Sequence, residues 1–132
     1  KYECVIAGVP HVYGTGGIHG AVPKYVGEGD LWHVDVTSYY PSLMLRWPEY
    51  CWSRTGADLE KFREMVANRV RWKAEGNPLA NAVKPLINGM YGAMKDPFNP
   101  LYDPRQANHI CIFGQLYLTD LIERTEHSSC VT

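Results

Sequence analysis

The sequence predicts an α+β protein of about one domain. Residues 1–36 are rich in Gly and Val, whereas the later stretches place apolar residues at helical spacing and are separated by Pro and Gly. Strands followed by a run of helices are typical of the α+β class. At 132 residues and 45% hydrophobic content, the chain can bury a moderate core.

In the strand block, residues 22–26 and 31–36 predict a hairpin, because two β-forming runs flank the Gly-rich turn 27–30. Its second strand ends near Asp35. Pro41 then opens a short helix that continues to about Arg46, because the fixed φ of proline fits the first helical position.

Two helices follow, joined by a short turn at Asn77-Pro78 and expected to run antiparallel. The first has a capping-box pattern at Thr55-Gly56-Ala57-Asp58 and extends as far as Gly76. Its inward face is expected to hold Leu59, Phe62, Val66 and Val70. The second runs from about Leu79 to Tyr91 with Gly92 as its left-handed end residue, and Pro85 is expected to kink it. Its inward stripe is expected to hold Val83, Leu86, Ile87 and Met90.

The last predicted helix begins after a loop marked by three prolines, at positions 97, 100 and 104. Asp103 is expected to cap it, and it should end near Thr125. The residues expected to face inward are Ile110, Phe113, Tyr117, Leu121 and Ile122.

The composition excludes several classes of protein. Four cysteines without a C-x-x-C pair suggest neither a zinc site nor a disulfide framework, so we expect reduced thiols and a cytoplasmic location. No apolar run approaches the roughly 18 residues that span a bilayer, which predicts a soluble protein without a membrane partner. A formal net charge of −1 gives no basic field for nucleic acid. The start at Lys1 carries no secretory signal and no initiator Met, so we expect an internal fragment.

Two constellations could carry chemistry. Asp35 stands at a predicted strand end, before a turn and a helix start whose free amides suit a metal-bound polyphosphate; the alternative is an ordinary capping Asp. Lys84, Asn88 and Tyr91 follow i, i+4, i+7 spacing and therefore share one helix face, which could also be a plain solvated surface.

Both constellations resemble motifs of family B (polymerase-alpha-like) DNA polymerases, in particular those of bacteriophage type. The family pattern D-x-x-S-L-Y-P-S is matched at residues 35–42 with Tyr39 for Leu, and K-x-x-x-N-S-x-Y-G is matched at 84–92 with Gly89 for Ser. Residues 13–17 resemble the family's Y-x-G-G element with one extra residue, and residues 16–20 read G-G-x-H-G as in phage members. By this resemblance His19 would lie near the template backbone.

The resemblance implies roles for the first motif. Asp35 and the carbonyl of Val36 would bind two Mg²⁺ ions for in-line nucleotidyl transfer. The amides of Ser38 and Tyr39 would hold the triphosphate. Tyr40 would be the steric gate whose ring excludes a ribose 2′-OH.

It also implies roles for the second motif and its neighbours. Lys84 would stabilise charge on the leaving group or donate a proton to it, and Asn88 would support the nucleotide pocket. Arg69 and Lys73, which share a face of the preceding helix, would form a second phosphate clamp, unless they are only a solvated basic face. The residues that would contact the template or the nascent base pair are Tyr13, Gly16, Gly17, Tyr91 and Gly92.

The fold implied is a partial palm of antiparallel strands with helices on one face, plus a two-helix fingers projection. Residues 1–54 and 96–132 would belong to the palm and 55–95 to the fingers. No D-T-D-like motif with the other metal carboxylate is present, so we expect a truncated fragment that is inactive alone. The expected partners are primer-template DNA, deoxynucleoside triphosphates and the remaining polymerase domains. Alternatives are a non-catalytic nucleic-acid or protein-binding module and a two-metal nuclease, although a nuclease would need a carboxylate cluster.

Overall fold

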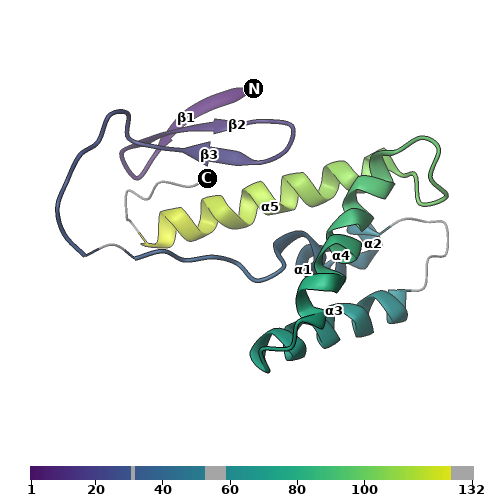
Figure 1. The fold of residues 1–132 in the computed structure, drawn as a ribbon. Coiled ribbons are helices and arrows are strands. Elements are labelled where there is room, and N and C mark those ends of the chain that lie inside the picture. The colour runs from purple at the N-terminus through teal and green to yellow at the C-terminus, as the bar shows by residue number, and fades with distance from the viewer. Residues whose placement is uncertain (31, 53–58, 126–132) are drawn as a thin grey trace. The chain divides into compact units, whose positions relative to one another are not determined.

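The computed structural model describes residues 1–30, 32–52 and 59–125 (Figure 1). The chain divides into two compact units. The sheet unit combines residues 1–36 with the chain from Cys111 onward, and the helical unit comprises residues 37–110. The α+β class predicted from the sequence is confirmed, with a three-stranded antiparallel sheet and helices.

The sheet unit is built on a meander of three strands, β1 (Tyr2–Ile6), β2 (Val9–Tyr13) and β3 (Ile18–Gly20). Ala7 and Gly8 connect the first pair, and both have positive φ, 49° and 77°. A two-residue loop of this kind matches the right-handed twist of the flanking strands and fixes the pairing of Ile6 with Val9.

One face of this sheet packs on helix α5 (Pro104–Thr125), which continues from the helical unit into the sheet unit. Ile6, Ile18 and Ile122 form the buried cluster. The Tyr13 hydroxyl lies 2.6 Å from Thr119 Oγ1, a second link between strand and helix. The sheet and the latter part of α5 therefore share one core.

The close approach of the buried His11 ring explains why residue 20, the last of the G-G-x-H-G segment, is glycine. The two residues are directly opposite on β2 and β3, and His11 is only 1% exposed. A Cβ at position 20 would lie 2.2 Å from the His11 ring, so any side chain there would displace it. His19 is exposed, on the opposite face of β3.

The predicted hairpin of residues 22–26 and 31–36 is wrong. Residues 22–26 and 32–36 form no strand, and Leu31 lies outside the described residues. Trp32 and Val34 are 90% and 79% exposed. A strand needs a neighbouring strand for its backbone hydrogen bonds, and an isolated two-stranded hairpin has only marginal stability. In addition, Pro23 lacks a backbone donor and Lys24 has a positive φ of 53°, which does not fit a strand.

The helical unit begins with α1 (Tyr39–Arg46), followed by the single turn α2 (Pro48–Cys51). Helix α1 starts earlier than predicted, with Ser38 as N-cap, and the Ser42 amide donates to the Ser38 carbonyl at 2.8 Å. Pro41 therefore occupies the third helical position instead of the first. Proline is still tolerated there, because amides of the first turn lack intrahelical acceptors.

Helix α3 (Leu59–Ala74) buries Phe62 and Val66 as predicted, but Val70 is 45% exposed and Arg69 takes its place on the buried face. The predicted capping box at residues 55–58 lies outside the described residues. The helix ends in a left-handed Gly76 with φ 68°, and the Asn77 amide donates to the Trp72 carbonyl at 2.8 Å. This is a Schellman motif, which satisfies carbonyls of the last turn.

Helix α4 (Leu79–Lys95) is longer than predicted, since it continues past Gly92 to Lys95, with Asp96 as its C-cap. Its buried residues are Ala80, Ile87 and Met94, whereas Leu86 is 62% exposed. At about 100° per residue, Leu86 lies on the flank of the helix away from these three side chains. Burial of Met94 requires another helical turn after Gly92 and outweighs the glycine's weak helix preference.

α3 and α4 pack against each other and against α1. In Figure 1 the chain turns back from the end of α3 into α4. The left-handed Gly76 and the following Pro78 redirect the chain within four residues, 75–78.

The start of α5 confirms the predicted cap, because Asp103 Oδ1 accepts the Gln106 amide at 3.2 Å. Ile110 and Ile122 are buried as predicted, but Tyr117 and Leu121 are 43% and 44% exposed. The side chains that turn inward at intervening positions include Cys111 and Leu118.

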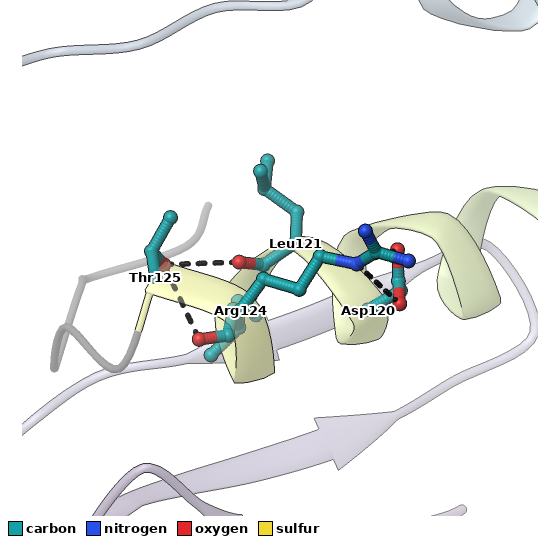
Figure 2. Close-up of polar contacts among 5 residues, drawn as sticks. Asp120, Leu121, Arg124 and Thr125 are labelled. Carbon is teal, nitrogen blue, oxygen red and sulfur yellow. Dashed lines mark hydrogen bonds and ion pairs between the residues drawn. The ribbon is translucent and has the colours of Figure 1, made fainter.

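At the other end of α5, Arg124 Nε lies 2.9 Å from Asp120 Oδ1, and the Thr125 hydroxyl donates to the Leu121 carbonyl at 2.9 Å (Figure 2). The described part of the helix extends to Thr125, and the chain after this residue lies outside the described residues, so the predicted end is not tested. Across the described residues, no helix combines the length and apolar character needed to span a membrane.

The two glycines inside α4 provide a stability test. Among the described residues, no atom apart from the chain neighbours and the nearby backbone of α4 itself lies within 4 Å of a Cβ built at Gly89 or Gly92. We expect Gly89→Ala to raise the free energy of unfolding by about 1 kcal/mol, because alanine is the better helix former. Urea denaturation measures the change. Gly76→Ala is the matched control and should lower stability, since its φ of 68° disfavours a side chain; equal effects of the two substitutions would contradict this account.

Candidate functional site

The candidate site is centred on the turn before α1. Ser38 has φ 53° and ψ 51°, the left-handed conformation, which costs roughly 1–2 kcal/mol for a residue other than glycine. Its side chain makes no capping hydrogen bond to α1; instead its Oγ accepts a hydrogen bond from Arg69 Nη1. Strained backbone held by a side chain from another helix is characteristic of functional turns.

Arg69 reaches this turn from α3 and is 9% exposed. Its Nε is buried and has no hydrogen-bond partner among the described residues. A buried guanidinium donor without an acceptor is costly, and its planar fork suits a phosphate or carboxylate. Together with the positive end of the α1 dipole, it makes the turn attractive to an anion.

Aromatic rings join α1 to α4 beside this turn. The centroids of Tyr40 and Tyr91 are 4.8 Å apart with the planes at 61°, an edge-to-face contact. Tyr39 is the next ring, with its centroid 6.2 Å from that of Tyr40. Both Tyr40 and Tyr91 are half-buried, so part of each side chain remains accessible.

Lys84 and Asn88 lie on the same face of α4 as Tyr91, and both are exposed. Pro85 removes a backbone donor directly after Lys84, and α4 continues through it to Lys95. Lys73 is also exposed, one turn beyond Arg69 on α3. Of the residues predicted for nucleotide binding, the structure therefore brings Ser38, Tyr40 and Arg69 together at one turn.

The remaining predicted residues belong to the sheet unit. Asp35 and Val36 are exposed, in a stretch without regular structure, so the prediction that Asp35 ends a strand is wrong. Tyr13, Gly16 and Gly17 lie at the β2–β3 turn. Here the Gln115 amide Nε2 donates to the carbonyls of Gly14 and Gly17, at 2.6 and 3.1 Å.

The carboxylates differ in their suitability for a metal. Within residues 1–30, 32–52 and 59–125, no group of three or more His, Cys, Asp or Glu side chains could hold an ion. Asp96 accepts the Phe98 amide at 3.0 Å, Asp103 caps α5 and Asp120 pairs with Arg124, so these three have structural contacts. Asp35 and the Val36 carbonyl are hard oxygen donors that suit Mg²⁺, but they are too few to complete its coordination sphere.

A thiol nucleophile is excluded at Cys51. Burial, with a smaller contribution from the Glu49 carboxylate, raises the pKa of this thiol to about 12. The group is therefore neutral near pH 7, and only the thiolate is nucleophilic.

Sequence reasoning missed the contacts that connect these residues. The contact of Arg69 with Ser38 depends on how α3 is rotated about its axis, which no local pattern specifies. Lys95 was also missed, although it continues the 84, 88, 91 spacing by one more turn. No protein-family model, curated protein or solved structure matches the chain. Its function has to be inferred from the residues and their geometry.

Proposed function

We propose that the chain forms palm and fingers portions of a family B DNA polymerase, which extends a primer from deoxynucleoside triphosphates. The main support is the contact between Arg69 and Ser38. It joins a basic residue of the helix before the K-x-x-x-N motif to the turn of the D-x-x-S-x-Y-P-S motif. The edge-to-face contact of Tyr40 with Tyr91 links the same two motifs through their aromatic residues.

In this proposal the triphosphate binds at the turn before α1. Arg69 is buried at this turn, its Nη1 donates to Ser38 Oγ, and its Nε has no partner among the described residues, so its guanidinium places a positive charge where phosphate oxygens would bind. The amides of Ser38 and Tyr39 and the positive end of the α1 dipole favour the same anion. Lys73 adds a second, exposed positive charge on α3.

Asp35 and the carbonyl of Val36 would bind Mg²⁺ together with carboxylates supplied by the rest of the polymerase. The bound ions would activate the primer 3′-hydroxyl and neutralise charge on the transferring phosphoryl group. Lys84 would protonate or electrostatically stabilise the departing pyrophosphate. Tyr40 would close the space that a 2′-hydroxyl needs, and Asn88, Tyr91 and Gly92 would support the nascent base pair.

The test separates binding residues from catalytic ones in primer-extension kinetics of the full-length protein. Arg69→Met and Lys73→Met should raise the KM for deoxynucleotide, each by about 10-fold or more, because a charge-assisted hydrogen bond contributes roughly 1.5–3 kcal/mol. Lys84→Ala should mainly lower kcat, since charge on the leaving group develops in the transition state.

Arg63→Met is the matched control. Arg63 lies on the same helix, is exposed and pairs with Glu60 at 3.5 Å, so its loss removes a charge without touching the turn. Urea denaturation of each variant separates loss of folding from loss of binding. If Arg63→Met changes the KM as much as Arg69→Met does, the clamp is wrong.

A further inference from the structure

Lys95 interacts with a residue of the candidate site although it belongs to neither motif. Its Nζ lies 4.6 Å from the centroid of the Tyr91 ring, a cation–π distance. The residue is exposed in the last turn of α4, where a positive charge also interacts favourably with the helix dipole.

The position of Lys95 on α4 places it in line with the site. Residues 84, 88, 91 and 95 are separated by four, three and four positions, so at about 100° per residue they share one helix face. Tyr91 is the half-buried member of this row, and its neighbour on the next turn is Lys95.

A continuous set of ring contacts connects Lys95 to Tyr40. The ammonium of Lys95 lies over the Tyr91 ring, and the Tyr91 ring meets the Tyr40 ring edge to face with centroids 4.8 Å apart. Each contact favours one orientation of the rings, because an aromatic ring has a negative face and a positive edge. The face attracts the Lys95 ammonium, and the edge of one tyrosine ring is attracted to the face of the other. Lys95 therefore biases the orientation of Tyr91, and Tyr91 biases that of Tyr40.

We propose that Lys95 is a positioning residue for sugar discrimination, acting on Tyr40 through the ring of Tyr91. The inference rests on the proposed function, in which Tyr40 excludes the ribose 2′-hydroxyl. Steric overlap excludes the 2′-hydroxyl strictly only if the Tyr40 ring is held in a fixed position. A Tyr40 ring that can move aside accepts the extra oxygen at lower cost.

The test is the ratio of ribonucleotide to deoxynucleotide incorporation by the full-length protein. Lys95→Gln should raise this ratio by about 2- to 5-fold, as expected from loss of an exposed cation–π contact, with deoxynucleotide kcat and KM little changed. Lys95→Arg should retain the wild-type ratio, because a guanidinium also stacks on an aromatic face. Lys61→Gln removes an exposed lysine charge from α3 and should leave the ratio unchanged.

A double-mutant cycle tests the route through Tyr91. Tyr91→Leu should raise the ratio, and adding Lys95→Gln to it should cause no further increase. An unchanged ratio in Lys95→Gln, or a fully additive effect in the double mutant, would overturn the inference. Weaker primer-template binding with an unchanged ratio would overturn it too, because Lys95 would then be a DNA phosphate contact.

Two further readouts distinguish failure of this inference from failure of the proposed function. If deoxynucleotide incorporation is absent or does not depend on Asp35, both are wrong. If incorporation depends on Asp35 but the ratio of ribonucleotide to deoxynucleotide incorporation does not change in Lys95→Gln, only the positioning role of Lys95 is wrong. Independently of activity, the ε-methylene protons of Lys95 should show an upfield ring-current shift in NMR spectra that disappears in Tyr91→Leu; its absence from the unmutated protein would overturn the cation–π contact itself.

Discussion

Asp35→Asn should abolish nucleotide incorporation by the full-length protein while primer-template binding persists. In the proposed function this carboxylate binds Mg²⁺, and the substitution keeps the shape of the side chain but removes the charge that this role requires. Metal ions contribute several kcal/mol of transition-state stabilisation, so the rate should fall by about 10³-fold or more. The proposed phosphate contacts to the DNA do not use this carboxylate and should survive.

Single-turnover primer extension measures the rate, and fluorescence anisotropy with labelled primer-template measures binding. Asp30→Asn is the matched control, since Asp30 is an exposed carboxylate in the same stretch of chain. Near-normal extension by Asp35→Asn, or an equal loss in Asp30→Asn, would remove the basis for assigning Asp35 to the metal site.

The helix ends that sequence reasoning predicted correctly are those governed by local chemistry. Asp103 followed by Pro104 is sufficient to specify the start of α5, because both the capping hydrogen bond and the fixed φ act within one turn. The end of α4 could not be predicted in this way. Gly92 has the chemistry of a helix end, but burial of Met94 by tertiary packing overrides it.

Strand prediction failed for residues 22–26 and 32–36 because pairing is a non-local property. The alternation of apolar and polar residues, with Trp32 and Val34 on one side, fits a half-buried strand, yet neither side chain is buried. The strands that do form, β1 to β3, are joined by short turns whose backbone geometry brings them together. An apolar pattern alone provides no partner for the backbone groups.

At the candidate site, the sequence predicted a set of residues but not the contacts between them. The two motifs pointed to Ser38, Tyr40 and Tyr91, and the i, i+4 spacing with Lys73 pointed to Arg69. It did not predict that Arg69 would replace Val70 on the buried face of α3, because apolar periodicity assigns that face to the more hydrophobic residue. Burial of an arginine there is stabilised in part by its hydrogen bond to Ser38, a contact between residues 31 positions apart.

Replacement of Tyr40 by Val should let the full-length protein incorporate ribonucleotides readily with only modest loss of deoxynucleotide turnover. The ring would exclude a 2′-hydroxyl by steric overlap, and forcing an extra atom into a packed space costs roughly 1–3 kcal/mol. The ratio of ribonucleotide to deoxynucleotide incorporation should therefore rise by about 10- to 100-fold. This change exceeds the one expected for Lys95→Gln, since the ring itself is removed instead of being allowed to move.

Tyr39→Leu is the matched control for the gate. Tyr39 is the adjacent ring on α1, and leucine is the residue that the family pattern carries at this position, so the ratio should not change. Urea denaturation of Tyr40→Val measures the stability lost with the edge-to-face contact to Tyr91; such a pair contributes about 0.5–1.5 kcal/mol. If Tyr40→Val lowers stability but leaves the ratio at its original value, Tyr40 serves only to pack α1 against α4 and the discrimination must arise from another side chain.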